Sequence, residues 1–184
     1  MNTDSLVKAC LRGNEQAQRQ LYDAFASQMM GVCYRFTKSI EDAEDVLQES
    51  FIKVFTNLSQ YKGDGEVGAW IRKIIVNTAL AYLKKHRHYS NELLINEDHM
   101  HVISDDHPEI NVQVKELIEM IRQLPVGYQT IFNMHAIEGY SHIEIGKLLG
   151  ISEGTSRSQY MRARNQLICW LQKQPGESKK TSYA

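Results

Sequence analysis

Residues 139–164 constrain the fold of this chain more than any other segment, because they carry the local signals for two short helices joined by a tight turn. Ser141 followed by Glu144 has the spacing of a capping box at the start of a helix. Gly150 suits the left-handed residue that ends this helix, and Ser152 can cap the next one. The segment therefore predicts a helix-turn-helix.

Apolar spacing assigns an inner face to each of these two helices. In the first helix the expected inward residues are Ile143, Leu148 and Leu149. In the second, which should end near Trp170, they are Thr155, Tyr160, Ala163, Leu167 and Trp170. The residues left for other faces are Arg157, Ser158, Met161, Arg162 and Arg164. Because the early turns of a recognition helix meet base edges and phosphates in the major groove, the pattern predicts binding to duplex DNA. A helical hairpin with solvated arginines is the alternative.

Helical periodicity also runs through the rest of the chain. The 184 residues include only three prolines, and apolar side chains recur every three or four positions without convincing strand-like alternation. We therefore predict an all-α protein of two small helical bundles, the second containing the helix-turn-helix. The bundles are expected at 1–88 and 110–174, joined by a flexible acidic linker at 89–109 and followed by a disordered tail at 175–184.

Individual helices can be placed from caps and breakers. Gly13 should close a short first helix, Asn14 should cap a long second helix, and Ser39 and Asp42 should begin a third. A fourth is expected from about 67 to 86, after a loop at 62–65. In the second bundle, Pro125 stops a helix whose inward residues are expected to be Val114, Leu117, Ile118, Ile121 and Leu124.

Charge is segregated along the sequence although the net charge is only −1. Residues 68–91 contain Lys and Arg but no acid, whereas residues 92–109 contain acids but no Lys or Arg. Such segregation predicts distinct binding surfaces. Three dispersed cysteines without a CxxC pair indicate a reducing compartment. Without a signal peptide or an apolar run long enough for a membrane span, a cytoplasmic protein with no membrane insertion is expected.

The first candidate surface is acidic and lies on the outer face of the helix that begins near Ser39. Its members are Glu41, Asp42, Glu44, Asp45 and Glu49. Carboxylates on consecutive helical residues point around the helix, which is poor geometry for one metal ion. A solvated face, or a docking surface for a basic partner, is favoured over metal catalysis.

The second candidate surface is a basic helix with aromatic residues. Arg72, Lys73, Asn77, Lys84, Lys85 and Arg87 share it with Trp70 and Tyr82. Basic side chains follow phosphates, and an aromatic ring can stack on an unpaired base. Trp70 fits a core position and a base contact equally well.

Two other functional classes find little support. His86, His88, His99, His101 and His107 could chelate a metal, but exposed unpaired histidines are the simpler interpretation. An enzyme would need a converging catalytic set, and we find neither a phosphate-cradling glycine loop nor a nucleophile with a base at plausible spacing. No metal, other cofactor or small-molecule substrate is expected.

The combination resembles the bacterial RNA polymerase sigma factors of the sigma-70 family, and more narrowly the two-domain extracytoplasmic-function (ECF) group. The resemblance spans about residues 6–171. Residues 42–55 match the family's regions 2.1–2.2, and residues 70–77 match region 2.3 running into 2.4. Leu124-Pro125 and residues 139–164 match regions 4.1–4.2.

The resemblance implies a partner for each surface. Core RNA polymerase would bind Asp42, Glu44, Asp45, Gln48 and Glu49. The opened −10 promoter element would contact Trp70, Arg72, Lys73, Asn77, Lys84, Lys85 and Arg87, with the flipped base near residues 65–70. The −35 duplex would contact Arg157, Ser158, Met161, Arg162 and Arg164. An anti-sigma factor is a further expected partner, and no catalysis is implied.

Three residues depart from the family pattern. Met161 stands where many relatives are aromatic or polar, Ser156 where an aliphatic residue is usual, and Gly146 where alanine is common. These departures bear on the −35 sequence preference. The rival function is a conventional helix-turn-helix regulator that binds duplex DNA without polymerase and uses its first bundle for dimerisation or ligand sensing.

Overall fold

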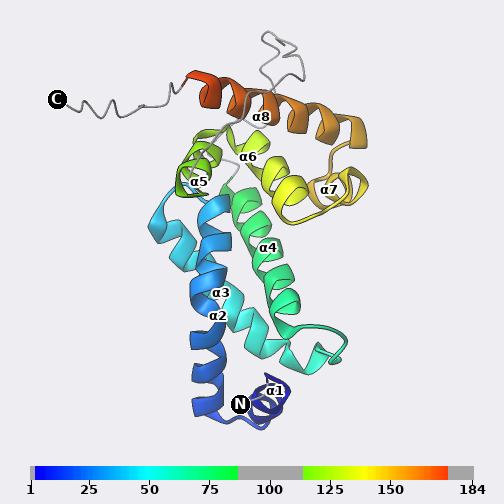
Figure 1. Ribbon diagram of the computed structural model, residues 1–184. Coiled ribbons are helices and arrows are strands. Elements are labelled where there is room, and N and C mark those ends of the chain that lie inside the picture. Colours follow the sequence, from blue (N-terminus) through cyan, green and yellow to red (C-terminus); the bar gives the residue numbers. More distant parts are fainter. Residues whose placement is uncertain (1–2, 87–113, 174–184) are drawn as a thin grey trace, which may run out of the picture. The chain divides into compact units, whose positions relative to one another are not determined.

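The computed structural model describes residues 3–86 and 114–173 (Figure 1). The chain divides into two compact units, Met1–Asn91 and Glu92–Ala184. All regular secondary structure in the described ranges is helical, which confirms the all-α prediction. The predicted linker at 89–109 and the predicted tail at 175–184 lie outside these ranges, and so does Arg87.

The first unit is built from four α-helices and one short 3-10 turn: α1 (Thr3–Leu11), α2 (Glu15–Phe36), α3 (Ile40–Thr56), η1 (Leu58–Gln60) and α4 (Val67–His86). Asn14 caps α2, its Oδ1 accepting the Ala17 N–H at 2.9 Å. Ser39 caps α3 in the same way, its Oγ accepting the Asp42 N–H at 3.0 Å. Both predicted caps are confirmed, and they satisfy amide groups that a helix start leaves unpaired.

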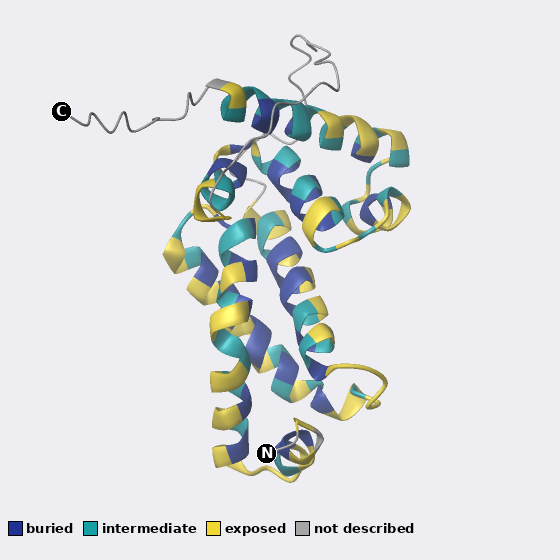
Figure 2. Ribbon diagram, in the orientation of Figure 1, coloured by how far each residue is buried: buried dark blue, intermediate teal, exposed yellow. Residues whose placement is uncertain are grey.

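The core of this unit lies among α2, α3 and α4, each of which has one buried and one exposed side (Figure 2). Leu21, Met29, Ile71 and Ile75 are almost wholly buried. Burying each such side chain stabilises the unit by roughly 1.5–3 kcal/mol. Because these inner faces are committed to packing, the outer faces of α3 and α4 are fixed in direction.

The second unit contains α5 (Val114–Gln123), α6 (Val126–Phe132), the π-helical turn η4 (Asn133–Ile137), α7 (His142–Leu149) and α8 (Glu153–Lys173). Its central cluster joins α5 to α8 through Met120, Ile121, Leu124, Ala163 and Leu167. Helix α5 ends two residues before Pro125, as predicted.

Several predicted core positions are wrong. Ile143 and Leu148 are 54% and 46% exposed, and α7 instead buries Ile145 and Gly146. Val114 is 75% exposed at the first position of α5. For Ile143 and Leu148 the physical reason is that α7 has only eight residues, so three- and four-residue spacing fits more than one choice of inner face.

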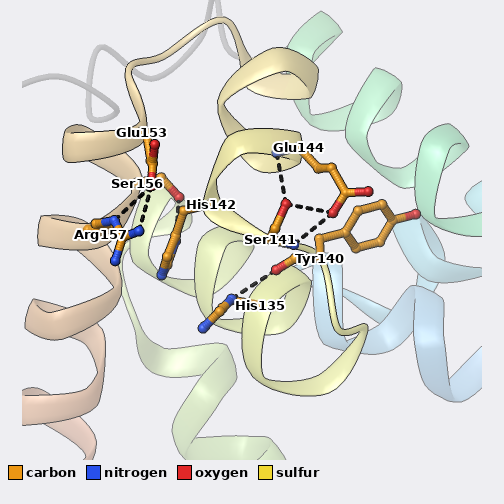
Figure 3. A network of polar contacts seen from close by, with 8 residues as sticks. All are labelled: His135, Tyr140, Ser141, His142, Glu144, Glu153, Ser156 and Arg157. Carbon is orange, nitrogen blue, oxygen red and sulfur yellow. Dashed lines mark hydrogen bonds and ion pairs between the residues drawn. The ribbon is translucent and has the colours of Figure 1, made fainter.

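The helix-turn-helix itself is confirmed. The Ser141–Glu144 capping box is present, with the Glu144 carboxylate accepting the Ser141 N–H at 2.8 Å (Figure 3). Gly150 has φ +70°, the left-handed conformation expected at the turn. Ser152 Oγ accepts the Thr155 N–H at 2.9 Å and so caps α8.

Gly146 permits the close approach of the two helices at this turn. A Cβ at residue 146 would lie 2.8 Å from the carbonyl oxygen of Ile151, closer than a real Cβ approaches an oxygen. The Ile151 N–H also donates to the Gly146 carbonyl at 3.0 Å. Glycine at residue 146, in place of alanine, therefore leaves room for this tight turn.

A pair of stacked histidines joins η4, α7 and α8 (Figure 3). The rings of His135 and His142 lie 4.0 Å apart between centroids, and the His135 and Tyr160 rings meet in a T-shaped arrangement with centroids 4.7 Å apart. His135 Nδ1 donates to the Tyr140 carbonyl at 2.8 Å. His142 Nδ1 lies 2.9 Å from Oγ of Ser156, which is wholly buried. The hydroxyl of Ser156 therefore serves as the polar partner of His142.

Burial lowers the pKa of His142, and the neighbouring His135 and Arg157 lower it further against an opposing effect of Glu153. A histidine whose pKa is lower in the folded state binds a proton more tightly in the unfolded state, so protonation favours unfolding. Its stabilising effect is complete above the ordinary pKa of about 6.5 and is lost as the pH falls through the folded-state pKa. The second unit should therefore lose stability as the pH falls below about 6.5.

Urea unfolding of the full chain can measure this effect, because each unit has one tryptophan, Trp70 or Trp170. In the variant Trp70→Phe, tryptophan fluorescence comes from Trp170 alone and therefore follows the unfolding of the second unit. We expect a lower unfolding midpoint at pH 5.5 than at pH 7.5, and a smaller difference after His142→Gln. An equal pH dependence with and without His142 would contradict the assignment.

Candidate nucleic-acid interface

Helix α4 presents a polar and aromatic stripe on its exposed side. At about 100° per residue, Trp70, Lys73, Asn77 and Lys84 fall within about 60° of one another around the helix axis. Lys73, Asn77 and Lys84 are exposed, whereas Trp70 is half-buried. Trp70 contacts the Tyr61 ring and is only partly buried, so packing leaves some of its surface accessible, and its contact with a base stays a prediction.

The structure separates the other residues predicted on this helix from the stripe. Arg72 lies about 160° from Trp70 around the axis and is half-buried. Lys85 lines a hollow between α3 and α4 together with acidic residues. Arg87 lies beyond the described part of α4. Their assignment to DNA stays a prediction, with less geometric support than the four residues of the stripe.

The predicted docking residues of α3 form two rows. Asp42, Asp45 and Glu49 follow one edge and line the hollow of about 460 Å³, whose other walls are Ala81, Tyr82, Lys85 and His86 of α4. Glu44 and Gln48 lie on the other edge of the exposed side. All except Asp42 are exposed, because α3 buries its apolar side among α2 and α4.

Asp42 is held by a residue that sequence reasoning did not place with it. Tyr82 donates its hydroxyl to Asp42 Oδ1 at 2.5 Å. This hydrogen bond lowers the pKa of Asp42, while burial and the same bond raise the pKa of Tyr82 to about 12. The Tyr82 ring in turn stacks on His86 at 4.0 Å. Asp42 is therefore a carboxylate of fixed position in the lining of the hollow.

Two further features of this surface were not predicted. Glu49 pairs with Lys53 at 2.6 Å, which holds one acid beside a cation. Ile52 is 66% exposed and lies on the outer side of α3, between the two acidic rows around the axis. An exposed isoleucine among carboxylates was a usable sequence signal. The surface thus combines exposed apolar area with negative charge, which is complementary to a basic protein partner.

On α8 the predicted DNA-facing residues lie opposite the buried side. Arg157, Ser158 and Met161 are exposed, and Arg162 is half-buried on the same outer side. Arg164 is also half-buried and lies nearer the packed edge. Glu153 accepts two N–H groups of Arg157, at 3.0 and 2.5 Å, which orients this guanidinium at the first turn (Figure 3).

The predictions on metal-binding histidines and on membrane spans concern residues both inside and outside the described ranges. His86 is exposed, and its Nδ1 lies 2.9 Å from the Tyr82 carbonyl, while the other four of these histidines, His88, His99, His101 and His107, lie outside the described residues. Within residues 3–86 and 114–173, no group of three or more His, Cys, Asp or Glu could hold a metal ion. None of the helices in these ranges has the length and apolarity needed to cross a membrane.

Comparison with known proteins gives the family. Residues 21–89 match "Sigma-70 region 2", and residues 115–167 match "Sigma-70, region 4". The ECF RNA polymerase sigma-E factor of Haemophilus influenzae is 29% identical over 178 residues, which cover 91% of this chain and 94% of that protein. The ECF RNA polymerase sigma factor SigW of Bacillus subtilis is 26% identical over 172 residues, 88% of this chain and 92% of that one.

A solved structure shares the fold. The sigma factor RpoE of Bartonella quintana, crystallised with the anti-sigma factor NepR, superposes with a TM-score of 0.53 at 17% identity, over 85% of this chain and 98% of that chain. The two matched regions fall one in each compact unit, and together they contain α3, α4 and the helix-turn-helix. This chain is therefore a member of the sigma-70 family, an RNA polymerase sigma factor of the ECF group.

Proposed function

We propose that the chain binds core RNA polymerase through the outer side of α3, opens and holds the −10 element with α4, and contacts the −35 duplex with α8. The observation that carries this proposal is the arrangement of the first unit. Its acidic rows on α3 and its Trp–Lys–Asn stripe on α4 are exposed on different helices of one packed bundle. A protein partner and a DNA strand can therefore be bound together.

The sign of the α3 surface supports docking to a basic partner. Glu44, Asp45 and Glu49 are exposed carboxylates, and Arg–carboxylate hydrogen bonds provide direction as well as attraction. The hollow beside Asp42 is lined by three carboxylates, which can attract a cationic side chain of the polymerase. Exposed Ile52 adds apolar contact area. This chemistry suits a specific protein interface better than a metal site.

The α4 stripe supports contact with a single strand. Lys73 and Lys84 lie about 16 Å apart along the helix axis, so they can contact phosphates a few nucleotides apart, and Asn77 between them offers an amide to a base edge. The exposed part of Trp70 can stack on an extruded base, which offsets a few kcal/mol of unstacking. Strand opening would then need no ATP, and no catalysis is assigned to the chain; sigma factors are not an enzyme family.

The α8 surface supports contact with duplex DNA. Arg157 is held outward by Glu153, and Met161 offers an apolar contact of the kind that recognises a thymine methyl group. We further propose an anti-sigma partner, as in the Bartonella complex, and a cytoplasmic location, where bacterial RNA polymerase works. The conventional regulator that acts without polymerase is not favoured, because both matched regions are those of sigma factors.

The docking assignment can be tested by charge reversal. The double variant Asp45→Lys with Glu49→Lys should weaken binding to core polymerase by about tenfold or more, because it places like charges against a basic partner. Fluorescence titration of labelled full-length protein with core enzyme measures the dissociation constant.

A matched control keeps the same change in net charge away from α3. Glu15 and Asp23 are exposed acids of α2, and Glu15→Lys with Asp23→Lys should leave core binding near that of the parent protein. If both double variants lose affinity for core polymerase equally, the effect depends on overall charge alone, and the docking surface is refuted.

The −35 assignment can be tested at Arg162. Arg162→Ala should cost about 1–3 kcal/mol of discrimination if this guanidinium reads a base bidentately. Holoenzyme affinity is compared on a promoter selected by the parent holoenzyme from a randomised library and on the same promoter with a scrambled −35 element.

Arg164 provides the contrast, because it lies nearer the packed edge of α8. Arg164→Ala should weaken binding to both promoters about equally and reduce the salt dependence, as expected for a phosphate contact. If Arg162→Ala also weakens both promoters equally, Arg162 does not read sequence.

A further inference from the structure

The loop between η1 and α4 has a defined shape on an otherwise exposed surface. Residues 62–66 are all exposed. Gly63 and Gly65 have φ of +79° and +95°, conformations that residues with a Cβ rarely adopt. A loop of this kind needs an external contact to hold one conformation.

Tyr61 supplies that contact in two ways. Its hydroxyl donates to the Gly65 carbonyl at 2.6 Å, across the loop. Its ring lies 5.7 Å from the ring of Trp70 between centroids, tilted by 51°. One side chain therefore ties the far end of the loop to the first turn of α4.

The start of α4, which carries Trp70, is held in place by contacts that do not involve Tyr61. A Cβ at Gly68 would lie 2.9 Å from the Phe25 ring of α2, so α4 and α2 are in close contact at this level. The Ala69 N–H also donates to the Glu66 carbonyl at 3.0 Å, which starts the helix. The Glu66 carbonyl thus joins the last residue of the loop to α4, and the bond from the Tyr61 hydroxyl to the Gly65 carbonyl holds the loop from its other end.

We propose that Tyr61 is a positioning residue that holds loop 62–66 beside Trp70 in the shape that receives the extruded base of the opened strand. The inference rests on the proposed role of α4 in opening the −10 element. A loop that is already ordered near Trp70 lowers the ordering cost when a base enters. Tyr61 itself acts through the loop and through Trp70.

The experiment compares full-length Tyr61→Phe with the parent protein in holoenzyme. Phenylalanine keeps the ring contact and removes only the hydrogen bond. With a 2-aminopurine probe in the −10 element of the selected promoter, the opening rate should fall about threefold to tenfold. Affinity for core polymerase and for a −35 duplex fragment should not change.

A second readout separates positioning from general stability. Removing the extruded base, by an abasic site at that position, should slow opening strongly with the parent protein. The same abasic site should slow it less with Tyr61→Phe, because the loop that receives the base is already displaced. Gly65→Ala, which disfavours the backbone of the loop at φ +95°, should reproduce both effects.

Tyr128→Phe, at a half-buried tyrosine of the other unit, is the matched control and should behave like the parent protein. Opening by Tyr61→Phe at the parent rate, or an undiminished effect of the abasic site, would overturn the proposal. Loss of core binding by Tyr61→Phe would also overturn it, since the role would then be structural. If the parent holoenzyme itself fails to open the promoter, the proposed function of α4 fails, which is a distinguishable result.

Discussion

The packing of α4 against α2 and α3 is the constraint on which the proposed chemistry depends. Ile71, Ile75 and Ala79 are wholly buried in this contact, and they fix which side of α4 is exposed. The exposed side carries Trp70, Lys73, Asn77 and Lys84, while the side toward α3 brings Tyr82 to Asp42. A rotation of α4 by one residue, about 100°, would bury the lysines and break the Asp42 contact. Core burial, electrostatics and strand binding are therefore set by one helix orientation.

Polar contacts complete what apolar packing leaves undetermined in both units. In the first, the Tyr82–Asp42 bond fixes a carboxylate at the acidic surface, and the Tyr61–Gly65 bond shapes a loop. In the second, the stacked pair His135–His142 and the buried Ser156 hydroxyl connect the two helices of the helix-turn-helix. Net hydrogen-bond energies of about 0.5–1.5 kcal/mol make these bonds small contributors to stability, but each one selects a geometry. The effect of the two tyrosine bonds is accordingly expected in binding and opening more than in unfolding.

Local signals could be read from the sequence, and contacts distant in sequence could not. The caps at Asn14 and Ser39, the capping box of Ser141 and the turn at Gly150 each depend on residues within four positions, and all are confirmed. Ile143 and Leu148 were assigned wrongly because a short helix does not fix its own inner face. The residues of the pairs Tyr82–Asp42 and His142–Ser156 are 40 and 14 positions apart in the sequence, so no local pattern predicts these contacts. The departure at Ser156 was visible in the sequence, but its partner became apparent only in the fold.

The central claim is that this chain gives promoter specificity to RNA polymerase and acts on DNA only together with it. Run-off transcription with purified core enzyme tests that claim most directly, using a promoter selected by the holoenzyme. We predict a discrete transcript with core and chain together, none with core alone, and weak binding of the chain alone to the same duplex. Tight binding of the chain alone to the promoter, with no transcript when core is added, would contradict the account. A conventional helix-turn-helix regulator would then explain the chain better.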